Sequence, residues 1–114
     1  AVLGMAVVEY LFNKYPTASE GELTMMKHRL VSTETLAKNA QKLGLGNFMR
    51  VGRGEEKTGG RRKQALLADT MEAVIAAVFF DSGYISARNF VHKILAEDFR
   101  EITPSSSIDY KTLL

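Results

Sequence analysis

Apolar residues dominate the start of the chain and predict a buried helix there. Residues 2–12 are apolar except Gly4 and Glu9, and Pro16 should end the helix after Tyr15. No capping residue precedes this helix and no initiating Met is present, so we expect the natural protein to continue upstream. We expect upstream helices to cover the apolar side formed by Leu3, Val7 and Leu11.

The next two helices are predicted by the residues that begin them. Ser19 and Glu22 stand three apart in a capping box, ahead of apolar residues at spacings of three and four. Ser32 or Thr33 then caps a third helix, which ends at Gly44. The apolar face predicted for this third helix consists of Leu36, Ala37, Ala40 and Leu43.

A glycine-rich basic segment separates this half of the chain from the next. Six of the nine glycines fall within residues 44–60, which predicts a loop. Residues 50–63 carry a local charge of +4, which leaves −2 for the rest of the chain. The segment suits contact with nucleic-acid phosphates, and an ordinary solvated loop is the alternative. It is not a P-loop, because Glu56 stands where that motif needs glycine.

Two apolar helices are predicted after the loop. Residues 62–80 form the first, and thirteen of the sixteen residues in 65–80 are apolar, which places it at the centre of the core. Asp81, Ser82 and Gly83 should end it. The second helix covers residues 84–102, and the apolar stripe expected along it consists of Phe90, Val91, Ile94, Leu95, Phe99 and Ile102. With no alternating strand pattern, the fold class is all-α.

Composition excludes several classes of protein and of metal site but does not identify the activity. The length of 114 residues and 46% apolar content suit one domain. No apolar run is long enough to span a membrane, and there is no Cys, so disulfides and thiolate metal sites are excluded. Any metal would need oxygen or imidazole ligands. We expect both histidines, His28 and His92, to lie on the surface rather than in a metal site.

Two carboxylates interrupt the most apolar helix. Asp69 and Glu72 are three residues apart, so they share one helical face, and in a partly desolvated site they would repel unless a cation compensated. Mg²⁺ would do so while keeping water ligands. The alternative is that they favour the helix dipole or simply face solvent. Glu20, after the Ser19 cap, is either a third carboxylate of the same cleft or only a favourable first-turn charge.

The order and spacing of these segments resemble the ribonuclease III family. The matching motifs are Tyr15-Pro16 with Ser19-Glu20-Gly21-Glu22-Leu23, the glycine-rich loop through Gly59-Gly60-Arg61-Arg62, and Ala68-Asp69-Thr70-Met71-Glu72-Ala73 with Asp81-Ser82-Gly83. The family's most diagnostic stretch, Glu-Arg-Leu-Glu-Phe-Leu-Gly-Asp, is absent and would lie immediately before Ala1. Ala76 stands where the family usually has Gly.

The resemblance implies an all-helical nuclease that cuts double-stranded RNA as a homodimer with Mg²⁺, or Mn²⁺ in its place, to 5′-phosphate and 3′-hydroxyl ends. It implies Asp69 and Glu72 as metal ligands, with Glu72 most needed for catalysis and Glu20 positioning water. The missing stretch would supply the other ligands, so we expect the 114 residues alone to be inactive or nearly so. The cations expected to contact the RNA backbone are Arg53, Lys57, Arg61 and Arg62.

By the same resemblance, residues 1–102 are part of the nuclease domain, and residues 103–114 are a linker and the start of a double-stranded-RNA-binding domain. The expected role is processing of rRNA and mRNA in the cytoplasm. Two alternatives stay open at this point: a catalytically silent dimerising scaffold that binds RNA, and a helical metal-dependent nucleotide phosphohydrolase. Residues upstream of Ala1 would separate the first from a nuclease, and nucleoside triphosphates offered beside duplex RNA would separate the second.

Overall fold

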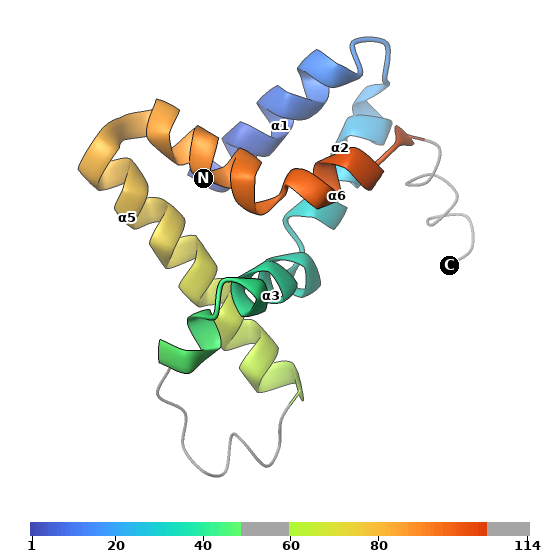
Figure 1. The fold of residues 1–114 in the computed structure, drawn as a ribbon. Coiled ribbons are helices and arrows are strands. Elements are labelled where there is room, and N and C mark those ends of the chain that lie inside the picture. The colour runs from blue at the N-terminus through green and yellow to red at the C-terminus, as the bar shows by residue number, and fades with distance from the viewer. Residues whose placement is uncertain (49–59, 105–114) are drawn as a thin grey trace.

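The computed structural model describes residues 1–48 and 60–104, and in these ranges the chain forms helices and no strand. Figure 1 shows α5 as a long bent helix with the shorter helices gathered along one side of it. The bounds are α1 Val2–Lys14, α2 Glu20–Leu30, α3 Thr33–Lys42, the 3₁₀ turn η1 Leu45–Phe48, α5 Gly60–Ile94 and α6 Ala96–Glu101. The predicted all-α class is confirmed for the described residues.

Local capping chemistry begins and ends the first helices as expected. Ser19 accepts a hydrogen bond from the Glu22 amide at 3.1 Å, and the Glu22 carboxylate accepts one from the Ser19 amide at 2.8 Å, which completes the capping box of α2. Ser32, rather than Thr33, is the N-cap of α3. After α3 the chain turns at Gly44, whose φ of 74° is a left-handed conformation that suits glycine.

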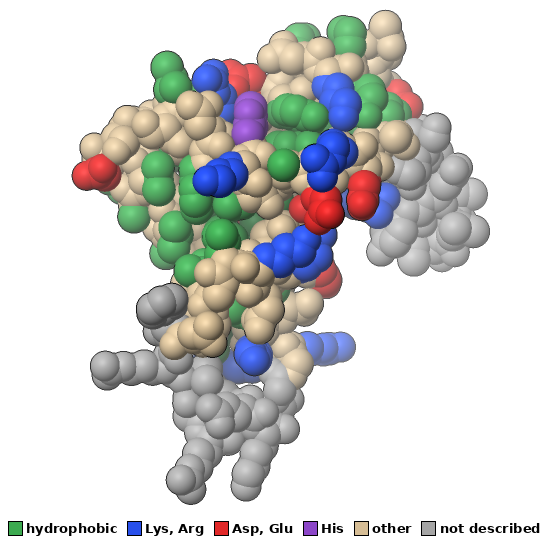
Figure 2. All heavy atoms as spheres, in the orientation of Figure 1, with side chains coloured by type: hydrophobic (Ala, Val, Ile, Leu, Met, Phe, Trp, Pro, Cys, Tyr) green, Lys and Arg blue, Asp and Glu red, His purple; other side chains and the backbone are tan. Residues whose placement is uncertain are grey.

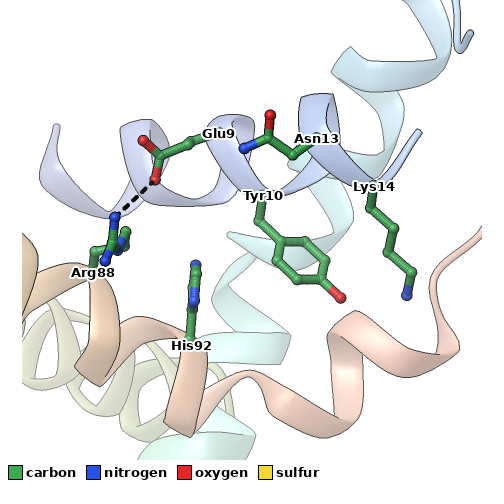
Figure 3. A pocket seen from close by; sticks show the side chains of 6 residues that line it. All are labelled: Glu9, Tyr10, Asn13, Lys14, Arg88 and His92. Atoms are coloured by element: carbon green, nitrogen blue, oxygen red, sulfur yellow. Dashed lines mark ion pairs between the residues drawn. The ribbon is translucent and has the colours of Figure 1, made fainter. Parts of the chain in front are cut away.

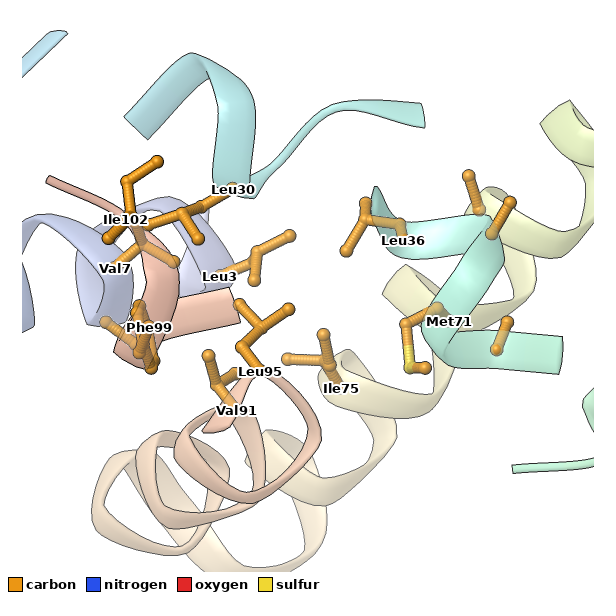
Figure 4. Close-up of a cluster of buried hydrophobic side chains, with 14 of the residues drawn as sticks. Leu3, Val7, Leu30, Leu36, Met71, Ile75, Val91, Leu95, Phe99 and Ile102 are labelled. Atoms are coloured by element: carbon orange, nitrogen blue, oxygen red, sulfur yellow. The ribbon is translucent and has the colours of Figure 1, made fainter. Parts of the chain in front are cut away.

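The core is a single cluster in which α1, α2 and α6 pack at one end and α3 and the first half of α5 at the other (Figure 4). Leu3, Val7 and Leu11 belong to this cluster and are buried within the described chain, so the expectation that upstream helices cover them was wrong. The exposed apolar residues of α1 are instead Met5, Val8 and Phe12.

Helix α5 is one-sided rather than central. Leu67, Ala68, Met71 and Ile75 are buried, whereas Phe80 is 84% exposed, so the predicted place at the centre of the core holds for one face only. Leu43 of the predicted α3 face also lies outside the core, at 48% exposure.

The chain bends sharply within α5. Gly83 has φ 87° and ψ −179°, outside the helical region, so it separates two helical halves that run on either side of it. Beyond it, the predicted helix over 84–102 is broken: α5 ends at Ile94, and α6 begins after Leu95. In the described part of the chain, no helix is both long and apolar enough to cross a membrane.

Candidate active site

The first half of α5 presents the two predicted carboxylates outside the core. Asp69 and Glu72 are both exposed, next to Ala68 and Met71, which are buried. The apolar residues thus fix the rotation of α5, and that rotation turns the carboxylates to solvent. Between them, the Thr70 hydroxyl donates to the Leu66 carbonyl at 2.7 Å, so it is engaged within the helix.

Both side chains face water, as the alternative interpretation of the pair expects. Among the described residues, the pair of carboxylates lacks a compensating group. Neither Asp69 nor Glu72 forms a hydrogen bond or ion pair with the residues that the structure describes. Oxygen donors with retained water ligands are the coordination that Mg²⁺ prefers, so the donor set fits that ion.

Glu20 is the first residue of α2 and is exposed. The charge lies in the helix's first turn, where it also favours the helix dipole. Within residues 1–48 and 60–104, no three or more Asp, Glu or His side chains group closely enough to hold a metal ion. Glu20 therefore does not join Asp69 and Glu72 in a three-carboxylate centre within the described residues.

Two of the four cations expected to contact RNA lie among the residues that the structure describes. Arg53 and Lys57 lie outside the described ranges. Arg61 and Arg62 are exposed in the first turn of α5, two helical turns before Asp69. Arg61 also lines an open hollow of about 520 Å³ between α3 and α5, together with the cations Lys38 and Lys63 and the single acid Glu34.

A second hollow, of about 470 Å³, lies between α1 and the second half of α5. Figure 3 shows Arg88 and His92 directed from α5 toward Glu9 and Tyr10 of α1. Its one carboxylate, Glu9, lies 4.0 Å from an Arg88 nitrogen, so the hollow lacks the ligand set of a divalent-metal centre. Burial, with the Glu9 carboxylate beside it, raises the pKa of the nearby Tyr84 hydroxyl.

The surface position expected for His92 holds only in part, because the side chain is half-buried where it lines this hollow. Its ring packs edge-on against Tyr10, with centroids 5.5 Å apart, and against Phe99 at 5.7 Å. Its Nε2 atom and the Nε atom of Arg88 are buried without a hydrogen-bond partner in the described chain. The sequence contains one sign of this hollow, because Glu9 is the one charged residue of the first apolar run. It contains no sign that Arg88 and His92, 79 and 83 positions later, would lie beside Glu9.

Comparison with known proteins places this geometry in a family. A family model described as ribonuclease-III-like matches residues 1–99. The Ribonuclease 3 of Nitratidesulfovibrio vulgaris is 46% identical over 115 residues, covering 100% of this chain and 46% of that protein. That of Treponema denticola is 43% identical over 115 residues, covering 100% of this chain and 47% of the relative. The chain therefore spans about half the length of the curated relatives it matches.

A solved structure supports the fold independently. The nuclease domain of ribonuclease III from Campylobacter jejuni, in a structure concerned with flexibility in a region involved in dimer formation, superposes with a TM-score of 0.77 at 34% identity. The match covers 87% of this chain and 69% of that one. A second structure of the same domain gives a TM-score of 0.76 over 90% of this chain and 69% of that chain.

Proposed function

This chain belongs to the ribonuclease III family, and from that premise we propose that the protein to which it belongs is a Mg²⁺-dependent endoribonuclease of double-stranded RNA. It would hydrolyse phosphodiester bonds to 5′-phosphate and 3′-hydroxyl ends, act as a homodimer, and process rRNA and mRNA in the cytoplasm. Mn²⁺ could replace Mg²⁺, since both are hard cations that bind oxygen ligands.

The observation that carries the proposal is the exposed pair Asp69 and Glu72 on α5, which has no hydrogen-bond or ion-pair partner among the residues that the structure describes. A carboxylate without a neighbouring cation or donor is available for a metal, and the i, i+3 spacing directs both toward one region of solvent. Asp69 and Glu72 would hold Mg²⁺, which when bound supplies positive charge to the phosphodiester and lowers the pKa of water. Further ligands would come from parts of the protein beyond this chain.

The remaining residues would position RNA rather than react with it. Arg61 and Arg62 stand in the first turn of the helix that carries the carboxylates, so a phosphate backbone held by them would pass near Asp69. Arg53 and Lys57 would add to this contact. Glu20 would orient water near the metal from the start of α2. Recognition would depend on the A-form shape, phosphates and 2′-hydroxyls of the duplex, not on base edges.

The decisive experiment is cleavage of a long RNA duplex by the full-length parent protein, with Mg²⁺ or with a chelator. We expect Glu72→Gln to abolish Mg²⁺-dependent cleavage while duplex binding survives, because the amide keeps the shape of the side chain and loses its charge. Glu101→Gln is the matched control, since Glu101 is an exposed acid on α6, and this variant should cut normally.

Other results of this experiment would support a different function or a different role for Glu72. Binding without cleavage by the unmutated protein would favour a catalytically silent RNA-binding scaffold. Hydrolysis of nucleoside triphosphates with no action on duplex RNA would favour a nucleotide phosphohydrolase. Full activity of Glu72→Gln would remove Glu72 from the catalytic role proposed for it.

A further inference from the structure

Two side chains at the end of α1 hold the end of α6. The Lys14 amine donates a hydrogen bond to the Phe99 carbonyl at 3.0 Å, and the Tyr15 hydroxyl donates one to the Ile102 carbonyl at 2.7 Å. The last carbonyls of a helix have no partner within it, so both bonds supply partners at the C-terminal end of α6. The end of α6 therefore lies beside the connection between α1 and α2 (Figure 1).

The ring of Tyr15 is held as well as its hydroxyl. It packs against the hydrophobic core, and the Lys14 ammonium lies 5.5 Å from its centre, within the range of a cation–π contact. Lys14 lies equally far from the Tyr10 ring, which stacks on Phe99 of α6. Figure 2 shows Lys and Arg side chains among hydrophobic ones on the face over α1 and α6. Tyr15 is thus anchored at both ends of its side chain.

The same residue begins the connection that leads to Glu20. Tyr15 is the C-cap of α1, and its carbonyl accepts a hydrogen bond from the Ala18 amide at 3.1 Å, which closes a turn. Ser19 then caps α2, and Glu20 is the first residue of that helix. Within residues 15–20, Tyr15 and Ala18 are partly buried against the core, and the other side chains are exposed. The Tyr15 hydroxyl joins this connection to another element, across 87 positions.

We propose that Tyr15 is a positioning residue for Glu20, which it holds in place through the connection between α1 and α2. This inference rests on the proposed function, in which Glu20 orients water near the metal. Tyr15 lies five positions before Glu20, and the closed turn at Ala18 keeps the path between them short. A displacement of the anchor should therefore displace the Glu20 carboxylate.

The capping box of α2 cannot replace this anchor. It joins Ser19 to Glu22, so it fixes these residues relative to one another and not relative to the rest of the molecule. Further along α2, Met26 and Leu30 are buried, and this part of the helix has its own contact with the core. Loss of the Tyr15 hydroxyl should thus loosen the first turn of α2 and leave the later turns in place.

The first test measures the start of α2 without using activity. In the full-length parent protein, Tyr15→Phe removes the hydroxyl and keeps the ring. We expect hydrogen exchange at the Ala18 and Glu22 amides to become at least about tenfold faster, because the turn and the capping box open more often without the anchor. Exchange at Leu30 should not change. Tyr10→Phe is the matched control, because the Tyr10 hydroxyl has no hydrogen-bond partner among the described residues.

The second test separates positioning from general stability. With Mg²⁺ and a long RNA duplex, Tyr15→Phe should lower kcat about tenfold and leave KM unchanged, because a displaced group slows the chemical step without weakening duplex binding. In a protein that already carries Glu20→Gln, Tyr15→Phe should have little further effect, since both changes act through one carboxylate. Asp98→Ala loosens α6 from α3 instead, so any loss of kcat that it causes should multiply with that of Glu20→Gln.

The outcomes distinguish this proposal from the nuclease function itself. Unchanged exchange at Ala18 and Glu22 in Tyr15→Phe would overturn the proposal, whether or not the parent protein cuts RNA. Normal cleavage by Glu20→Gln would overturn it, and so would an equal loss of kcat from Tyr15→Phe with and without Glu20→Gln. If the unmutated parent leaves duplex RNA intact, the nuclease function fails, and faster exchange in Tyr15→Phe would still establish that Tyr15 holds Glu20 in place.

Discussion

The side-chain amide of Asn39 on α3 donates a hydrogen bond to the carboxylate of Asp98 on α6 at 3.0 Å. The same amide nitrogen donates to the Thr35 carbonyl, also at 3.0 Å, and Lys38 completes the cluster by pairing with Asp98. Asn39 is 4% exposed and is the buried polar side chain of the described core. Because a buried amide must find acceptors, this contact fixes how α6 lies against α3.

Removing the acceptor should destabilise the fold. We expect Asp98→Ala to lower the free energy of unfolding by about 1–3 kcal/mol, because the Asn39 amide would stay buried with an unmet donor. Urea denaturation followed by circular dichroism measures the change. Glu101→Ala, at an exposed acid three residues later, should have a much smaller effect. Equal midpoints for Asp98→Ala and the unmutated chain would contradict this prediction.

The arginines at the start of α5 should set the salt dependence of RNA binding. For the full-length parent protein, we expect Arg61→Gln and Arg62→Gln each to reduce the slope of log affinity against log salt by about 1, because each lost phosphate contact releases one fewer counterion. Affinity should fall similarly for duplexes of different sequence. Lys93→Gln, at an exposed cation near the end of α5, should leave the slope unchanged. An unchanged slope in both arginine variants would remove them from the RNA contact.

The Lys42–Glu97 pair should be visible in a pH titration. Its hydrogen bond and charge lower the pKa of the Glu97 carboxyl and raise that of Lys42. A depressed acid pKa stabilises the fold above the unfolded value, and this contribution is lost as pH falls through the folded pKa. We therefore expect Lys42→Gln to return the Glu97 pKa toward 4.5, measured by carboxyl NMR, whereas Lys27→Gln should not. An identical Glu97 pKa in the Lys42→Gln variant and the unmutated chain would show that the pair does not form in solution.

Glycines 83 and 21 should respond to alanine in opposite directions. At Gly83, φ 87° with ψ −179° is a conformation that alanine resists, so Gly83→Ala should cost on the order of 1–3 kcal/mol of folding free energy. Gly21 lies inside α2, where an added Cβ would meet only the Ser19 hydroxyl oxygen at 3.9 Å. Gly21→Ala should thus stabilise by roughly 0.5–1 kcal/mol. Thermal denaturation of both variants compares the signs, and a harmless Gly83→Ala would mean that the bend tolerates L residues.

The exposed apolar side of α1 should make the 114-residue chain self-associate. Met5 and Phe12 are 62% and 61% exposed, and exposed apolar surface favours association between molecules in water. Light scattering at increasing concentration should report species larger than the monomer, and Met5→Gln with Phe12→Gln should reduce them. A monodisperse monomer at high concentration would show that this surface is tolerated.

The sequence predicted the elements that local chemistry decides. Capping residues Ser19 and Ser32 and the left-handed Gly44 act over a few positions, so the starts of α2 and α3 and the end of α3 followed from them. The break at Leu95 did not, since no Gly or Pro marks it. The helix after the break is held by contacts with α1 and the residue that follows it. The Lys14 amine donates to the Phe99 carbonyl at 3.0 Å, and the Tyr15 hydroxyl donates to the Ile102 carbonyl at 2.7 Å, so each bond joins residues more than 80 positions apart.

The features of the candidate site that depend on local spacing were predicted, and those that depend on packing were not. The face shared by Asp69 and Glu72 came from helical spacing alone, and so did their place among apolar residues. Their exposure did not, because it depends on which side of α5 meets α1 and α3. Likewise, His92 has polar and apolar neighbours in sequence, but the rings of Tyr10 and Phe99 that pack edge-on against it come from other helices.

The bend at Gly83 has a stereochemical consequence. Its backbone angles are near the mirror image of an ordinary extended L residue, so a residue of opposite handedness would adopt them without strain. A chain made by chemical ligation with D-alanine at position 83 should keep the bend. It should also lose less freedom on folding than glycine does, and so be more stable than the natural chain. At Gly83, a protein of L residues has the backbone geometry of its mirror image, and glycine, having no handedness, supplies it.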